Sequence, residues 1–241
     1  MILRILIKVK FLLYKFIIFI VFKYTHKFNQ FNKGKSLTFD QIINGHNSFL
    51  RWGDGETELL LGRSIYFQRS NFHISYGLLS ILLSRLFNNQ HNFFLGFPSN
   101  ESIENSACFN ETKKLMSIIG VKSGDFDANI LRNCYFSFFD FIKYLPSKSL
   151  LIAGNELGFH ILHNKLSLIG KKLELAKVPS CNSFESVMNL MSTIPWDDYE
   201  CIVISAGPAG KILGHELINK GYLVWDIGHG LDSMAKEILA S

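Results

Sequence analysis

The sequence predicts an α/β fold, with a mainly parallel, Rossmann-like sheet and helices on both faces. After residue 37, short apolar or β-rich runs alternate with longer runs whose apolar spacing is typical of helices. The expected strands are residues 49–52, 93–97, 149–153, 173–178, 200–206 and 222–226. The expected helices are residues 76–87, 104–119, 157–169, 183–191 and 209–219. This alternation implies crossover connections, which join parallel strands.

The domain organisation is simple. We expect one globular domain, residues 37–241, because no repeat, low-complexity tract or Pro/Ser-rich linker interrupts it. Its 48% apolar composition is ample for a core. Residues 126–144 are aromatic-rich and fit either a helix over the site or a part of the core.

Residues 1–36 form an N-terminal arm that carries most of the excess positive charge. The chain has a net charge of +5, but the arm holds eight Lys or Arg residues and no acidic residue. The remaining body has 17 basic and 20 acidic residues, which argues against a nucleic-acid-binding face. Arg4, Lys8 and Lys15 fall on one helical stripe, so we expect an amphipathic helix on the membrane surface. A signal peptide and a helix that docks on a protein partner are the alternatives.

The cysteines and one pair of histidines are expected to be structural. The four cysteines are far apart and form no C-x-x-C pair, so buried thiols are expected at Cys108, Cys134, Cys181 and Cys201. His160 and His163 lie three residues apart on an expected helix, and no third ligand with zinc-like spacing accompanies them.

A turn rich in glycine and carboxylates follows the first expected strand. Residues 53–56 read Gly-Asp-Gly-Glu, and the carboxylates of Asp54 and Glu56 can point at a common centre. Such oxygen ligands suit Mg²⁺ or Mn²⁺, while Gly53 and Gly55 leave room for a phosphate. The pattern predicts a divalent-cation site, although a solvated turn also fits these residues.

Other polar loops follow the later strands, where the ligands of open parallel sheets bind. Residues 207–211 read Gly-Pro-Ala-Gly-Lys and open an expected helix, whose free N–H groups suit a phosphate that Lys211 would reach. Neither a Walker A loop nor a G-x-G-x-x-G fingerprint is present. Asn155 lies in a similar loop after residues 149–153. Asp226 and His229 suit contact with a metal, a phosphate or an acceptor hydroxyl, or else a helix cap and a backbone-bonded imidazole.

Three stretches in this order resemble the bacterial GT-D-type glycosyltransferases. They are SFLRWGDGE at residues 48–56, VPSCNSFE at 178–185 and SAGPAGKILGHELINKGYLVWDIGHGLD at 205–232. The family signature is R-x-G-D-G-E with an Asp-x-Glu metal motif, which Asp54 and Glu56 match. The resemblance implies a single Rossmann-like domain that binds a nucleoside-diphosphate sugar through Mn²⁺ or Mg²⁺. It further places Arg51 and Asn182 near the donor, and Gly207, Pro208, Asp226 and His229 at the pocket.

The expected function is therefore metal-dependent transfer of a sugar from a nucleoside-diphosphate sugar to a glycan or lipid-linked glycan acceptor, in cell-surface polysaccharide or glycoconjugate synthesis. The expected catalytic residues are Asp54, Glu56 and His229, and the first two are also the expected metal ligands. The expected substrate-binding residues are Arg51, Gly53, Gly55, Asn155, Asn182, Gly207, Pro208, Lys211 and Asp226. The arm would place the enzyme on the cytoplasmic face of a bacterial inner membrane, or the enzyme would be cytoplasmic. Another nucleotide-binding α/β enzyme and a non-catalytic membrane-associated interaction protein remain alternatives.

Overall fold

The described part of the chain is built around one parallel sheet. The computed structural model describes residues 38–53, 56, 93–97, 126–127, 137–179 and 183–241. The strands are β1 (Phe49–Arg51), β2 (Phe94–Phe97), β3 (Phe126–Asp127), β4 (Lys148–Ala153), β5 (Lys172–Lys177), β6 (Cys201–Ser205) and β7 (Val224–Asp226). They form a seven-stranded sheet in the order β3-β2-β1-β7-β6-β4-β5, and every neighbouring pair is parallel.

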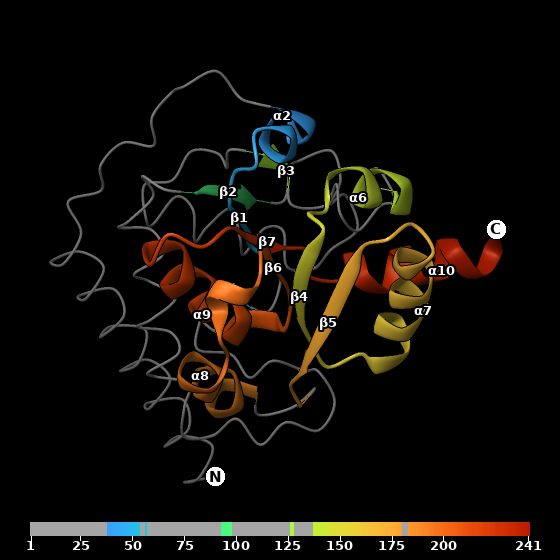
Figure 1. Cartoon of the computed structure of the whole chain (residues 1–241). Coiled ribbons are helices and arrows are strands. Elements are labelled where there is room, and N and C mark those ends of the chain that lie inside the picture. Colours follow the sequence, from blue (N-terminus) through green and yellow to red (C-terminus); the bar gives the residue numbers. More distant parts are fainter. Residues whose placement is uncertain (1–37, 54–55, 57–92, 98–125, 128–136, 180–182) are drawn as a thin grey trace, which may run out of the picture.

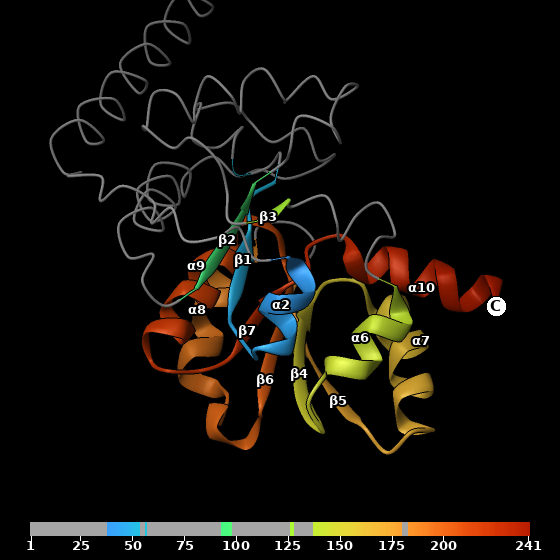
Figure 2. The ribbon, with the colours of Figure 1, turned by 90° about the horizontal axis from the view of Figure 1, so that it is seen from above.

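Helices cover both faces of this sheet, as Figures 1 and 2 show. The helices are α2 (Phe39–Asn44), α6 (Phe138–Tyr144), α7 (Glu156–Ser167), α8 (Ser183–Thr193), α9 (Gly207–Asn219) and α10 (Gly230–Ala240), with a 3₁₀ turn η3 (Trp196–Asp198). One face packs against α8 and α9, and the other packs against α2, α6, α7 and α10. The molecule therefore has three layers, helix on sheet on helix.

Successive residues of a central strand serve opposite layers. On β6, Ile202 and Ile204 pack with the α8 and α9 layer, whereas Cys201 and Val203 pack with the α7 and α10 layer. All four side chains are buried, which is typical of a parallel strand covered on both faces. Burial also raises the pKa of the Cys201 thiol well above its ordinary value, so this cysteine is a structural thiol, as expected.

Polar residues cap the N-termini of α2, α6 and α7, which lie on the same face of the sheet. Thr38 and Gln41 form a capping box at α2, and Ser137 and Asp140 form another at α6. Asn155 caps α7 by accepting a hydrogen bond from the backbone of residue 158 at 2.9 Å. These caps satisfy N–H groups that have no partner within the helix, and so they set where each helix begins.

The structure confirms the predicted α/β class and the predicted strands, each within a residue or two of its expected bounds. The expected helices 157–169, 183–191 and 209–219 correspond to α7, α8 and α9. The expected helices 76–87 and 104–119, and the arm of residues 1–36, lie outside the described residues. The ambiguous region 126–144 contains β3 and α6, whereas α2 and α10 were not predicted at all.

Two smaller expectations also have outcomes. His163 donates a hydrogen bond from Nδ1 to the carbonyl of Leu173 at 2.9 Å, and this contact joins α7 to β5. No helix in the described part of the chain is both long and apolar enough to cross a bilayer.

Candidate functional site

The polar loops predicted from the sequence follow neighbouring strands of the sheet. In the order β1-β7-β6-β4, the carboxyl ends of four strands lie side by side. Beyond them come Gly53 and Glu56 after β1, residues 227–229 after β7, residues 206–211 after β6 and residues 154–155 after β4. Because all the strands are parallel, these loops share one edge of the sheet, which is where α/β folds bind their ligands.

Four charged side chains, which come from β1, the turn after it, β7 and the first turns of α9, are buried together. We call Arg51, Glu56, Lys211 and Asp226 the buried charge cluster. Their relative exposures are 7%, 2%, 2% and 1%. Two cations and two anions balance formally, which is the condition under which charged groups persist in a protein interior.

Lys211 joins two carboxylates that come from different strands. Its Nζ lies 2.7 Å from Oε1 of Glu56 and 3.1 Å from Oδ2 of Asp226. Burial alone lowers the pKa of Lys211, but the carboxylates of Asp226 and Glu56 outweigh this effect and raise it. Lys211 is therefore a fixed ammonium between the end of β7 and the turn after β1.

The side chain of Asp226 also joins β7 to β1, because it accepts hydrogen bonds from backbone N–H groups. Its Oδ2 accepts a hydrogen bond from the backbone N–H of Arg51 at 3.0 Å, and its Oδ1 accepts one from Gly228 at 3.1 Å. Ser205 at the end of β6 donates its hydroxyl to the carbonyl of Gly228 at 2.7 Å. The loop after β7 is thus held from β1 on one side and from β6 on the other.

Two glycines leave space where this cluster needs it. A Cβ at Gly53 would lie 3.0 Å from Oε2 of Glu56 and 3.6 Å from Nη2 of Arg51. A Cβ at Gly228 would lie 2.6 Å from Cζ of Arg51, and Gly228 also has a φ of 48°. Both contacts bring backbone close to a charged side chain, which only glycine permits without displacement.

Glu56 is held through both carboxylate oxygens. Its Oε1 faces Lys211, and its Oε2 accepts a hydrogen bond from the backbone N–H of Gly53 at 2.8 Å. The alternative of a solvated turn does not hold for Glu56, since its side chain is only 3% exposed. The residues still fit a divalent cation: a carboxylate is the hard donor that Mn²⁺ and Mg²⁺ prefer, each oxygen keeps acceptor capacity, and Gly53 leaves room beside it.

The position of Lys211 also differs from the expectation that its side chain reaches a diphosphate at the start of the helix. Gly207, with a φ of 60°, and Pro208 do begin α9, and the N-cap residue Ala206 provides no side-chain cap. Lys211 lies one turn later, and its buried ammonium faces Glu56 and Asp226, with the carbonyl of Gly207 3.5 Å away. Its charge is therefore already used by two buried carboxylates.

His229 and Asn155 meet at Asp232, a residue on α10 that was not expected at the site. Asp232 lies 3.6 Å from Nδ1 of His229, and its Oδ1 accepts a hydrogen bond from Nδ2 of Asn155 at 2.5 Å. These contacts, His229 foremost, lower the pKa of Asp232 even though its partial burial acts in the opposite direction. His229 and Asp232 are 62% and 46% exposed, so this polar group lies at the rim rather than in the cluster.

Other expected site residues lie outside the described part of the chain. These residues are Asp54, Gly55 and Asn182. Within the described residues no group of three or more His, Cys, Asp and Glu side chains is arranged to hold a metal ion. The second carboxylate of the expected metal pair is Asp54, so the expected ligand pair stays a prediction.

A family model and solved structures match this architecture. Residues 133–234 match the family described as glycosyltransferase GT-D fold. The comparison with curated proteins gives no significant match.

One similar solved structure is that of the domain of unknown function 1792, described as having a distinct glycosyltransferase fold. It is 23% identical, has a TM-score of 0.65, and the match covers 85% of this chain and 81% of that chain. Another is described as a new glycosyltransferase from Streptococcus sanguinis, at 22% identity and a TM-score of 0.64, covering 83% of this chain and 81% of that one. The chain thus has the GT-D glycosyltransferase fold, which confirms the predicted resemblance.

Proposed function

We propose that this chain is a metal-dependent glycosyltransferase that moves a sugar from a nucleoside-diphosphate sugar to a glycan acceptor in cell-surface polysaccharide or glycoconjugate synthesis. The observation that carries the proposal is the position of Glu56. Its carboxylate is fixed by Lys211 and by the N–H of Gly53, at the edge of the sheet where this fold class binds ligands. Asp54, two residues earlier, completes the expected carboxylate pair.

The chemistry needs a group that offsets the negative charge of the departing diphosphate. A divalent cation supplies this charge when it is bound, as a Lewis acid that stabilises the leaving group. Glu56 and Asp54 would hold it, and the glycines on either side of Asp54 leave room for the phosphates. Lys211 holds Glu56 in place, and Asp226 holds both Lys211 and the loop after β7.

The acceptor side of the site would involve the loop after β7. His229 is exposed at the rim and lies beside Asp232, which Asn155 holds from the end of β4. An imidazole there suits an acceptor hydroxyl, since histidine exchanges protons near neutral pH. His229 is therefore the expected catalytic residue on this side of the reaction.

The proposal extends to the membrane. Eight basic residues and long apolar stretches in residues 1–36 suit attachment to an anionic leaflet. The enzyme would then work as a peripheral protein on the cytoplasmic face of a bacterial inner membrane, on a lipid-linked acceptor.

The direct test is donor turnover by the purified full chain. A panel of nucleoside-diphosphate sugars is incubated with the protein in Mn²⁺, in Mg²⁺ or in EDTA, and release of the nucleoside diphosphate is followed. We expect turnover of at least one donor with metal and none in EDTA. Glu56→Gln should lower the rate by about 100-fold, the order found when one electrostatic contact to the transition state is removed.

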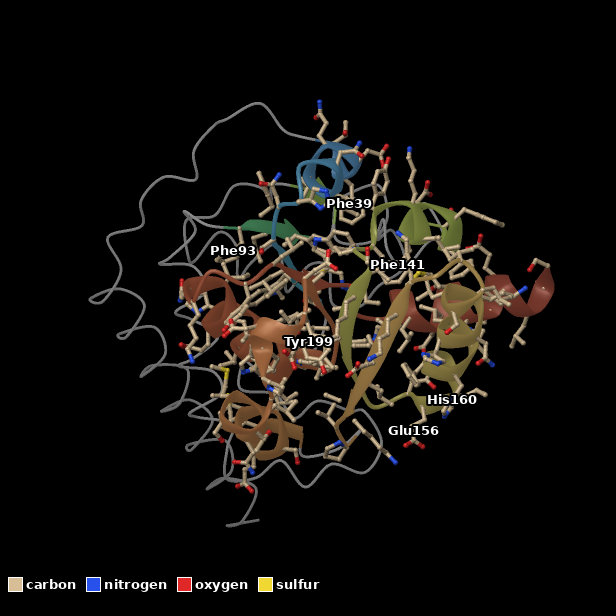
Figure 3. All side chains as sticks on the ribbon, viewed as in Figure 1. Phe39, Phe93, Phe141, Glu156, His160 and Tyr199 are labelled. Carbon is tan, nitrogen blue, oxygen red and sulfur yellow. The ribbon has the colours of Figure 1, made fainter. Side chains whose placement is uncertain are left out.

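The matched control is Glu156→Gln. Glu156 is a partly exposed carboxylate on α7 whose partner is Lys177, at 2.7 Å, and Figure 3 shows it near His160 at the outer side of the molecule. This variant should keep the wild-type rate. No turnover of any donor with either metal, or equal rates in EDTA and Mn²⁺, would overturn the proposal.

A further inference from the structure

The ammonium of Lys211 is fully committed to groups of the protein. Besides Glu56 and Asp226, the carbonyl of Gly207 lies 3.5 Å from Nζ. A lysine ammonium has three N–H donors, and three protein acceptors surround this one. With its side chain 3% exposed, Lys211 has little capacity left to bind a substrate directly.

Stability alone is a weak reason for such an arrangement. Replacing a buried ion pair by apolar side chains of similar volume is often neutral or stabilising, because desolvation of the charges offsets their attraction. A helix position facing the core would usually be filled by an apolar residue, as Ile212 and Leu213 show on the same turn of α9. The charge of Lys211 is therefore better explained by the carboxylates that its ammonium holds in place.

We infer that Lys211 is a positioning residue that sets the orientation of Glu56 for the metal and the donor, an inference that rests on the proposed function. The Glu56 side chain has three rotatable bonds, and Lys211 and the N–H of Gly53 fix one oxygen each. Its remaining acceptor directions are then set before any ligand arrives. A ligating carboxylate prepared in this way loses less conformational entropy on binding.

Asp226 gives Lys211 its own fixed position. Its carboxylate is anchored by the backbone N–H groups of Arg51 and Gly228, so it cannot follow the ammonium if Lys211 moves. The line of contacts runs from the backbone of β1 and β7, through Asp226 and Lys211, to Glu56. The orientation of the Glu56 side chain is thereby fixed relative to the edge of the sheet, and not only relative to its own turn.

The experiment measures binding of Mn²⁺ alone to the full chain, by the electron paramagnetic resonance signal of free Mn²⁺. Lys211→Met removes the contact to Glu56. A positioning role predicts Mn²⁺ binding weaker by about 10-fold or more, the usual effect of losing a partner of a metal ligand. If Lys211 only neutralises charge, its removal takes away a repelling cation and Mn²⁺ binding stays equal or becomes tighter.

Two further variants complete the test. Lys211→Arg keeps the charge and N–H donors toward Glu56 and should therefore bind Mn²⁺ more tightly than Lys211→Met does. Lys220→Met, at the exposed end of α9, should leave binding unchanged. If Lys211→Met does not fold, Lys211→Gln replaces it, because its neutral amide can still donate a hydrogen bond to a buried carboxylate and so leaves fewer acceptors without a partner.

The outcomes separate this inference from the proposed function. Wild-type protein that neither binds Mn²⁺ nor turns over any donor removes the function and the inference together. Wild-type protein that binds Mn²⁺ while the neutral Lys211 variants bind it equally or more tightly overturns the inference alone. Weaker binding in those variants, with kcat for the donor reduced and Lys220→Met unaffected, supports it.

Discussion

Gly228 lies directly against the guanidinium of Arg51, so that a Cβ at residue 228 would lie 2.6 Å from Cζ of Arg51. Arg51 ends β1 and Gly228 follows β7, and these two strands are neighbours in the sheet. The loop after β7 therefore packs on the guanidinium of Arg51, and a side chain at residue 228 would require Arg51 to shift. This contact sits between the buried charge cluster and the rim that carries His229.

Gly228→Ala is expected to lower both stability and donor turnover. A non-glycine residue at a φ of 48° costs about 1–2 kcal/mol, and the contact with Arg51 adds about 1–3 kcal/mol as an overpacked site. Urea denaturation measures the free energy of unfolding. The control is Gly170→Ala, because Gly170 has a φ of 75° but a Cβ there would meet none of the described residues within 4 Å. Equal losses in both variants would show that the Arg51 contact is unimportant.

Asp232→Asn is expected to change the pH dependence of stability on the acid side. The pKa of Asp232 is lowered in the folded protein, so the folded state favours its charged form. Its contribution to stability is then present above its ordinary pKa of 3.8 and is lost as the pH falls below that value. The difference between wild type and variant in urea denaturation should be seen at about pH 5.5 and should shrink at about pH 3.

The control for this prediction is Asp198→Asn, which changes an exposed aspartate on η3. It should show no comparable difference at either pH. A wild-type advantage over Asp232→Asn that is the same at both pH values would contradict the assignment, since it would not come from the carboxylate charge.

Replacing Arg4, Lys8, Lys10 and Lys15 by Gln is expected to release the protein from anionic vesicles at ordinary salt. Each basic residue near an anionic leaflet contributes about 1 kcal/mol. Co-sedimentation with vesicles measures the bound fraction, and donor turnover in solution should be unchanged because the expected site residues all lie at or after Arg51. Wild-type protein that stays on neutral vesicles through high salt would indicate a helix that spans the bilayer.

The sheet was largely predictable, because its central strands are apolar on both faces. Residues 149–153 and 200–206 are short apolar runs close to polar or glycine residues, which is the signature of a covered parallel strand. Helix α10 was missed although Leu231, Met234, Ala235 and Ile238 have the spacing of a buried helical face. Helix α2 is only six residues long, too short for a periodic pattern to be visible.

The loops of the site were predictable, but their contacts were not. Each of the glycine-containing loops after β1, β6 and β7 could be placed at one sheet edge from the strand pattern. That Lys211 turns inward to Glu56 depends on the order β1-β7-β6 across the sheet, since these partners are far apart in the chain. A sequence pattern holds no information about that order, so a lysine after a glycine turn looked like a phosphate ligand.

The pairing of β1 with β7 also governs when the protein can become active during its synthesis. The backbone N–H of Arg51 donates to Asp226, 175 residues later in the chain. A growing chain on the ribosome therefore carries Glu56 without the strand and the carboxylate that align it until β7 has been made. Long-range contacts of this kind also form slowly. The proposed donor site thus matures only after β7 has been made, and a chain that stops before β7 would have the Asp-x-Glu pair but no framework to hold it.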